Sequence, residues 1–206
     1  SGPIERAKDF LPQILLPRKV SIDKLYIGFY LIFWGFFQKL FIADNLAKIT
    51  DPVFASSAPY DGATVFIIFY AYVFQLYCDF AGYTNIAIGF GKLMGFDMMV
   101  NFNFPLFATS ISDFWRRWHI SLSTWVRDYV FTPLFVQLSR LKGDIRIYVA
   151  LLVTMILLGL WHGAAWKFIV FGVFEGALLI IHQKIQPKLK KPKSTLGNNI
   201  WLVLRI

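Results

Sequence analysis

Two histidines, His162 and His119, have the residue type and the surroundings that best suit chemistry in this chain. His162 stands in the motif GLWHG at the end of an apolar run, with Trp161 and Trp166 on either side of it. An imidazole takes a proton near neutral pH, so at membrane depth it could activate a hydroxyl for attack on an acyl group. A structural histidine is the alternative, and the residues alone do not separate the two.

His119 lies in FWRRWHISLSTWVRDYV, a stretch with helical periodicity over residues 112–129. We expect an amphipathic helix at the cytoplasmic face of a membrane, begun by a capping Ser110 or Ser112. One side of its helical wheel gathers tryptophans, and another side gathers arginines: Trp115, Trp118 and Trp125, then Arg116 and Arg127. The arginines could bind a phosphate-bearing donor or anchor the helix among lipid head groups. Taken alone, His119 is more often structural.

Other signals of chemistry are weaker. Asp79 falls near the end of an apolar run, where it could cap a helix, pair with an arginine of the middle segment or act in a site. The single cysteine, Cys78, excludes an internal disulfide framework, and the sequence shows no metal-binding cluster. The glycines between residues 82 and 95 follow no strand, so we reject a nucleotide-binding fingerprint.

The composition indicates a membrane protein. Of the 206 residues, 57% are hydrophobic and 16% are charged, which is more apolar than a soluble domain of this size. The net charge of +9 could suggest nucleic acid, but the basic residues stand in blocks between apolar runs. Membrane proteins place their basic residues in this way, so we exclude a nucleic-acid partner.

The apolar runs predict an all-α, polytopic transmembrane helix bundle with spans at about residues 25–42, 63–80, 147–161 and 165–182. A fifth span could begin at Ile200. Lysine and arginine number five, one, seven, one and five in the successive connections, so residues 43–61 and 161–167 are expected outside. Residues 83–134 are expected to hold the interfacial helix and re-entrant segments.

Five blocks of the sequence resemble one known family. They are SGPIERAKDF, QKLFIADNLAKITDPVF, DFAGYTNIAIGFGKLMGF, NFNFPLFATSISDFWRRWHISLSTWVRDYVFTPL and GLWHGAAWKFIVFG. In this order they resemble the membrane-bound O-acyltransferase family, in the branch of alginate O-acetyltransferases and teichoic-acid D-alanyl transfer proteins. The resemblance implies that residues 1–206 are one membrane domain, the central part of a longer acyltransferase.

The resemblance also implies roles. His162 matches the membrane-embedded histidine of the family and His119 its second signature histidine. Trp115, Trp118, Trp125 and Trp161 would line the cavity. Arg116 and Arg127 would dock a donor, either acetyl-CoA or a carrier-protein thioester, and no cofactor would be tightly bound. The acceptor would be an exported polysaccharide at a bacterial plasma membrane, surrounded by lipid and served by accessory extracytoplasmic acyltransferase or carrier proteins.

The chain departs from the family pattern in several places. Many relatives have Asp at position 85, Asn at 165 and His at 175, where this chain has Asn85, Ala165 and Glu175. Two other hypotheses therefore remain beside the O-acyltransferase: a transporter with a helix break at NFNFP, and a non-catalytic scaffold of an export complex. Transport of unmodified solute would favour the first, and acylation without either histidine would favour the second.

Overall fold

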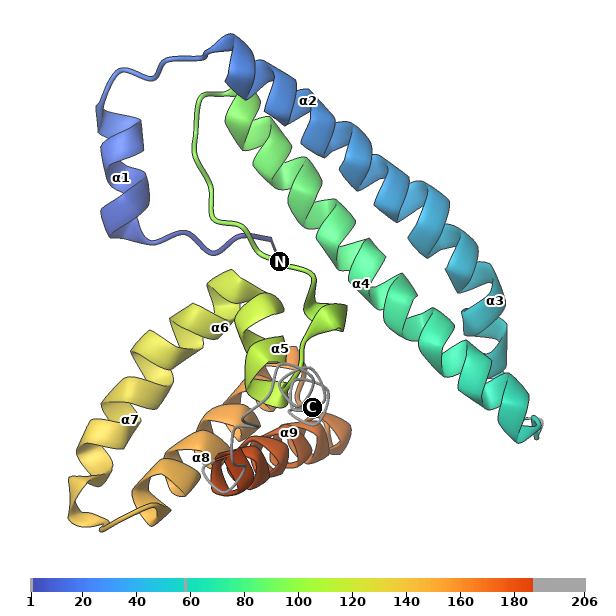
Figure 1. Ribbon diagram of the computed structural model, residues 1–206, viewed down its shortest axis with the longest axis vertical. Coiled ribbons are helices and arrows are strands. Elements are labelled where there is room, and N and C mark those ends of the chain that lie inside the picture. Colours follow the sequence, from blue (N-terminus) through green and yellow to red (C-terminus); the bar gives the residue numbers. More distant parts are fainter. Residues whose placement is uncertain (1, 58, 187–206) are drawn as a thin grey trace, which may run out of the picture. The chain divides into compact units, whose positions relative to one another are not determined.

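The computed structural model describes residues 2–57 and 59–186, which form helices and connecting segments without a strand (Figure 1). Four helical stretches are long and apolar enough to cross a bilayer: Ile22–Ala55, Gly62–Leu93, Ile145–His162 and Trp166–Ile185. They confirm the predicted all-α polytopic fold and the predicted number of spans. The expected fifth span at Ile200 lies outside the described residues. The chain divides into two compact units, Ser1–Asn101 and Phe102–Ile206.

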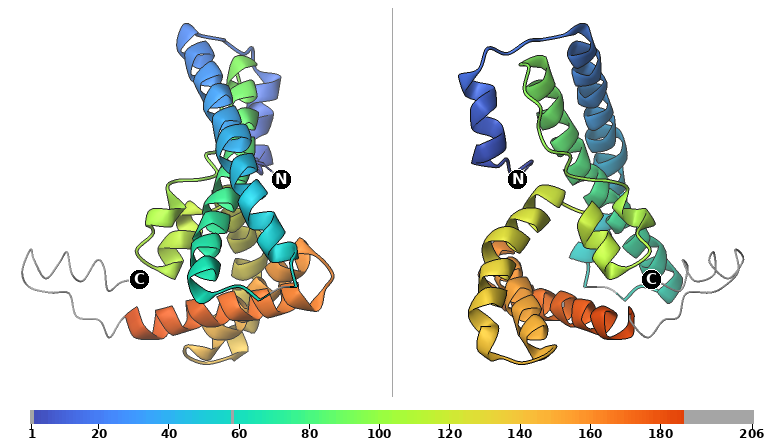
Figure 2. Two further views of the ribbon diagram at one scale, coloured as in Figure 1. Left: turned by 90° about the vertical axis from the view of Figure 1, so that its right-hand side faces the viewer. Right: turned by 60° about the vertical axis from the view of Figure 1, so that its left-hand side comes forward.

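The first unit is built on an antiparallel helix pair. One partner runs without interruption through α2 (Ile22–Phe36), a π-helical segment (Phe37–Ala43) and α3 (Asp44–Ala55), and the other is α4 (Gly62–Leu93). The two lie side by side in every view (Figures 1 and 2). The side chain of Ser21 caps α2 by accepting a hydrogen bond from the N–H of Lys24, and that of Asp61 caps α4 by accepting one from the N–H of Thr64. Gly95, with φ +85°, takes the left-handed conformation that ends α4.

Glycines bring these helices into close contact. A Cβ added to Gly35 would lie 2.6 Å from the carbonyl oxygen of Gly82, and one added to Gly89 would lie 2.7 Å from that of Gly28. The paired glycines are seven residues apart on each helix, which is two turns. Small residues at such spacing allow the backbones of membrane helices to approach each other. The glycine positions therefore set the register of the pair.

Polar side chains of this pair bond to one another across it. Asn85 donates to Gln38 at 2.7 Å, and Lys39 bonds Asp79 at 2.5 Å and Asp44 at 2.8 Å. The prediction that Asp79 pairs with an arginine of the middle segment was wrong, because its partner is Lys39. The lysine was available in the first span, but only the register of the two helices shows that it faces Asp79.

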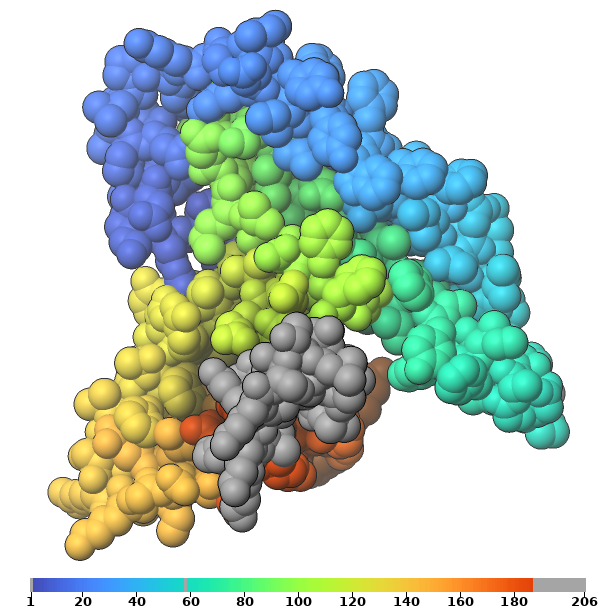
Figure 3. Space-filling view, in the orientation of Figure 1, coloured from blue at the N-terminus to red at the C-terminus, as the bar shows by residue number. Residues whose placement is uncertain are grey.

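The helix that contains the second predicted span, residues 63–80, continues well beyond residue 80. Residues 83–93, which we assigned to the interfacial region, continue α4 to a total of 32 residues. At 1.5 Å per residue this helix is about 48 Å long, whereas a hydrocarbon core is about 30 Å thick. The glycines there fit a helix because they serve packing rather than a turn. Tyr30 and Phe33 of α2 are exposed. Ring-shaped side chains stand out on the blue surface that α2 forms (Figure 3).

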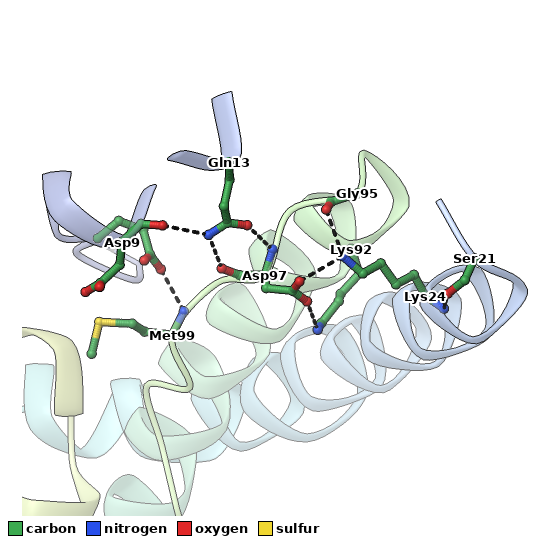
Figure 4. A network of polar contacts seen from close by, with 9 residues as sticks. Asp9, Gln13, Ser21, Lys24, Lys92, Gly95, Asp97 and Met99 are labelled. Atoms are coloured by element: carbon green, nitrogen blue, oxygen red, sulfur yellow. Dashed lines mark hydrogen bonds and ion pairs between the residues drawn. The ribbon is translucent and has the colours of Figure 1, made fainter. Parts of the chain in front are cut away.

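A polar network joins the short helix α1 (Ala7–Leu15) to the segment after α4 (Figure 4). Asp97 accepts from Lys24 at 2.8 Å and from Lys92 at 2.5 Å, and these bonds hold the pKa of its carboxyl below the usual value. The Gln13 amide bonds both the N–H and the carbonyl of Asp97, at 2.7 and 3.0 Å. The N–H of Met99 donates to Glu5. These contacts stabilise the end of the pair where α2 begins and α4 ends.

The second unit contains a series of short helices followed by a second helix pair. The short helices are α5 (Ile111–Arg117), α6 (Ile120–Val126), a π-helical segment (Arg127–Phe131) and α7 (Thr132–Gln137). The pair is α8 (Ile145–His162) and α9 (Trp166–Ile185), which pack against each other. The continuous helix predicted over residues 112–129 was wrong, because the chain leaves the helical conformation at Trp118 and His119. The capping role of Ser110 is confirmed by its bond from the Asp113 N–H.

The α8–α9 pair also packs through glycines. Gly172 and Gly176 of α9, four residues apart, face the backbone of α8 around Met155. Gly159 of α8 faces the backbone of Phe168 and Gly172. A Cβ at Gly159 or Gly172 would collide with the backbone of the other helix, and one at Gly176 would make a tight contact with Leu152. The register of this pair is therefore set in the same way as in the first unit.

Candidate active site

His119 occupies the turn between α5 and α6. Trp118 is extended, with φ −97° and ψ 127°, and His119 is left-handed, with φ 43° and ψ 54°. A left-handed conformation costs a residue with a Cβ about 1–2 kcal/mol, so the surrounding structure must hold it in place. Strain of this kind gathers at functional sites, which makes the turn a candidate for function.

Hydrogen bonds on both sides fix the turn. On its far side, the backbone N–H of Ser123 donates to the carbonyl of His119 at 2.9 Å, and the Ser123 hydroxyl donates to that of Trp118 at 3.0 Å. On its near side, the N–H of Asn103 donates to the carbonyl of Arg117 at 2.9 Å. The sequence-distant segment at Asn103 therefore helps to decide where the helix breaks.

The imidazole of His119 is buried, with 4% of the residue exposed, and it lies 6.4 Å from the ring of Phe102. Burial lowers its pKa to about 4, because the charged form loses hydration, and the charge of His162 acts in the same direction. His119 is therefore neutral at physiological pH and a weak base. Such an imidazole can orient or polarise a group by hydrogen bonding.

His162 is the last residue of α8 and stands among aromatic rings. The ring of Trp161 lies 4.9 Å away edge-on, and those of Phe168 and Phe171 lie 6.2 and 6.0 Å away. We expected Trp166 as the second flanking ring, but that residue is 81% exposed and Phe168 and Phe171 take its place. Within the described residues the side chain of His162 is exposed.

The tryptophans of the middle segment are divided between two helices. Trp118 stacks on Phe114 at 5.6 Å and meets Phe102 edge-on at 5.0 Å, on the side of α5. Trp125 lies on α6, where it is 39% exposed and contacts Tyr129 at 5.2 Å. The break at His119 therefore separates the aromatic face that the helical wheel had joined.

Arg116 and Arg127 keep most of their surface exposed, and each has a carboxylate nearby. The guanidinium of Arg116 lies 3.5 Å from Asp113, and that of Arg127 lies 2.8 Å from Asp128. Burial raises the pKa of the Asp113 carboxyl, but the hydrogen bonds from Arg117 at 2.9 Å and from the Thr109 N–H, together with the charges of Arg117 and Arg116, outweigh it, so the pKa is lowered. These arginines could meet an anionic group, in competition with the carboxylates.

Glu175 is a candidate functional residue that our sequence analysis did not identify. Glu175 of α9 accepts a hydrogen bond from the indole N–H of Trp115 at 3.2 Å. Its signal was present, because it is the only acidic residue in Trp166–Ile185. We noted it only as a departure from a family pattern. Asp79 belongs to the first unit, paired with Lys39 as described above.

The described residues contain no group of three or more His, Cys, Asp or Glu side chains placed to bind a metal ion. The arrangement that the second unit does offer is a buried neutral imidazole, an accessible imidazole and a carboxyl group held by an indole. These groups can accept, donate or orient a proton during attack by a hydroxyl.

The fold and these groups define a polytopic membrane protein with a histidine-containing site. Residues 1–196 match the model of the membrane-bound O-acyltransferase family, and the chain belongs to this family. It is 44% identical to the "Probable alginate O-acetylase" of Azotobacter vinelandii over 93% of this chain and 38% of the relative. It is 33% identical to a peptidoglycan O-acetyltransferase of Helicobacter pylori, over 98% of this chain and 38% of the relative. A teichoic acid D-alanyltransferase of Bacillus subtilis is 33% identical, over 99% of this chain and 53% of that protein. The chain thus spans well under half the length of the first two.

Proposed function

We propose that this chain is the part of a membrane O-acyltransferase that carries its acyl-transfer site. The acyl group, most simply acetyl, would come from a thioester donor on the cytoplasmic side, either acetyl-CoA or an acylated carrier protein. The acceptor would be a hydroxyl of an exported polysaccharide at the plasma membrane of a bacterium. Family membership and relatives named for O-acetylation of alginate and of peptidoglycan support this class of reaction.

The observation that carries the proposal is the pair of unlike histidines in one unit. His162 is accessible, so it can take the proton of the attacking hydroxyl while the oxygen forms a bond to the acyl carbonyl carbon. The thiolate then leaves and receives that proton from the imidazolium. His119 is buried and neutral, so it would orient donor or acceptor rather than serve as the base. Trp161, Phe168 and Phe171 would present an apolar wall to the acyl group.

Replacing His162 with alanine in the complete protein tests this mechanism. General-base catalysis raises a rate by about 10²–10⁴-fold, so the activity of the His162→Ala variant should be at least 100-fold lower than that of the wild type. The measurement is the amount of ester-linked acyl groups on the exported polymer, divided by the amount of the variant in the membrane. Unchanged esters at a normal protein level would remove the proposed base and favour a scaffold.

A further inference from the structure

Glu175 lies at the middle of the apolar helix α9 and is half-buried. A carboxyl group within a membrane span is costly, and such residues usually face the interior of a bundle and serve function. An apolar residue at position 175 would form the helix α9 equally well. The packing of α9 on α8 is made by the nearby glycines, Gly172 and Gly176. A purpose for this side chain must therefore come from what it contacts.

Its contact is the side chain of Trp115 on α5. The indole nitrogen Nε1 donates to Oε2 of Glu175 at 3.2 Å, and α5 packs against α9 at this place. The second carboxyl oxygen, Oε1, receives no hydrogen bond within the described ranges 2–57 and 59–186. One bond between side chains thus joins a spanning helix to a helix of only seven residues.

The position of this bond relates it to both histidines. Gly159 of α8 lies opposite Gly172 of α9, so His162 lies near the level of Ile169. Glu175 is six residues farther along, about 9 Å down the helix axis. Trp115 is followed by the left-handed turn at His119, which begins as soon as α5 ends. The bond therefore adds a contact on α5 four residues before His119, beside the bonds from Asn103 and Ser123 that hold the turn itself.

We propose that Glu175 is a positioning residue for the acyl-transfer site: by holding Trp115 it fixes α5, and through α5 it sets the place of the His119 imidazole. The proposal rests on the proposed function. A short helix that ends in a strained turn is free to shift unless side chains hold it. Movement of an orienting group by about 1 Å can cost on the order of 100-fold in rate, so the loss of one such bond would be seen mainly in the catalytic step.

The test compares three variants of the complete protein in native membranes: Glu175→Leu, Glu175→Gln and Trp115→Phe. Leucine removes the acceptor, glutamine keeps an acceptor oxygen, and phenylalanine removes the donor. The matched control is Phe174→Leu, at the neighbouring exposed position of α9. The readouts are kcat and KM with acetyl-CoA as the probe donor, ester content of the exported polymer, and the membrane level of each variant.

We expect Glu175→Leu and Trp115→Phe each to lower kcat at least tenfold and to change KM less than twofold, while Glu175→Gln keeps at least half of the activity. The double variant Glu175→Leu/Trp115→Phe should be no worse than either single change, because both remove one interaction. Additive losses, or normal kcat in Trp115→Phe, would overturn the proposal. If Glu175→Leu is degraded, Trp115→Phe decides alone.

His162→Ala, measured in parallel, separates this inference from the proposed function. If His162→Ala abolishes ester formation while Glu175→Leu and Trp115→Phe retain normal kcat, the positioning role is wrong and the acyltransferase remains. If His162→Ala also retains normal esters, both proposals are overturned.

Discussion

The two helix pairs of this protein use glycines in the same way but treat polar side chains differently. In α2–α4, polar residues bond one another across the pair: Lys39 with Asp79, and Gln38 with Asn85. In α8–α9, the described residues give the buried Thr154 hydroxyl no hydrogen-bond partner, and the carboxyl of Glu175 bonds a helix outside the pair. The first pair therefore uses its polar groups to fix structure, and the second leaves polar groups available for a site.

The difference teaches where chemistry can lie in a membrane protein. A polar group that is satisfied within a helix pair stabilises it by about 1 kcal/mol and gains little from a substrate. A group held by one contact, or set in a strained turn, keeps capacity to bond a substrate. His119 is such a group, and the contrast between the pairs can be tested by substitutions in each.

The largest expected effect comes from the close glycine contacts that bring the two helices of each pair together. Gly35→Ala places a methyl group 2.6 Å from the Gly82 carbonyl oxygen, so the backbones must separate, and we expect a loss of about 3 kcal/mol. The measurement is thermal unfolding of the complete protein in detergent. Gly62→Ala is the matched control, because no atom lies within 4 Å of its added Cβ, and its helix propensity should raise stability slightly. Equal stability of the two variants would show that the helices are not in close contact.

A second effect concerns pH. The pKa of His119 is about 4 in the folded protein and 6.5 in the unfolded chain, so the unfolded state binds more protons between these values. The contribution of His119 to stability should be nearly constant above pH 6.5, fall by about 2 kcal/mol between pH 7 and pH 5, and level off below pH 4. Asp97 and Asp113, with lowered pKa values, titrate below this window and do not contribute.

Unfolding curves at a series of pH values would show this dependence. In His119→Gln the slope between pH 7 and pH 5 should be reduced, because the buried titrating group is gone. A wild-type protein as stable at pH 5 as at pH 7 would contradict the burial of His119.

Breaking the ion pair of the first helix pair should have a somewhat smaller effect. Lys39→Met leaves Asp44 and Asp79 as neighbouring carboxylates without their cation, and we expect a loss of up to about 1 kcal/mol, because all three side chains are partly exposed to solvent. The double variant Lys39→Met/Asp79→Asn should recover part of this loss, because one charge is removed. A loss in the double variant that equals the sum of the two single losses would show that the residues do not interact. Thermal unfolding gives all of these values.

The smallest expected effects come from replacing one threonine in each helix pair. Thr50 donates to the Leu46 carbonyl at 3.1 Å and bonds Gln75, so Thr50→Val should cost about 1 kcal/mol. Thr154 is 5% exposed and its hydroxyl has no partner among the described residues, so Thr154→Val should raise stability by up to about 1 kcal/mol. Changes of the same sign in thermal unfolding would remove the contrast between the two pairs.

Much of the fold follows from local sequence. The apolar runs are long enough to span a bilayer, and Ser110 caps α5 as its residue type predicts. The break at His119 could not be predicted, because the helical periodicity of residues 112–129 continues through it. Where α5 ends, the Arg117 carbonyl accepts a bond from the N–H of Asn103, 14 residues earlier in the chain. The end of α4 was missed because glycines are read as turn residues, whereas those of α4 are packing positions.

The sequence by itself determined that this chain is an all-α membrane protein with four spans, and it singled out His162 and His119. These properties depend on composition, on run length and on motif, which are local. The tertiary structure alone decided which residues meet: Lys39 with Asp79, Glu175 with Trp115, and the aromatic rings that surround His162. Partners across a helix pair depend on register, and register is set by where the glycines of two helices allow their backbones to approach.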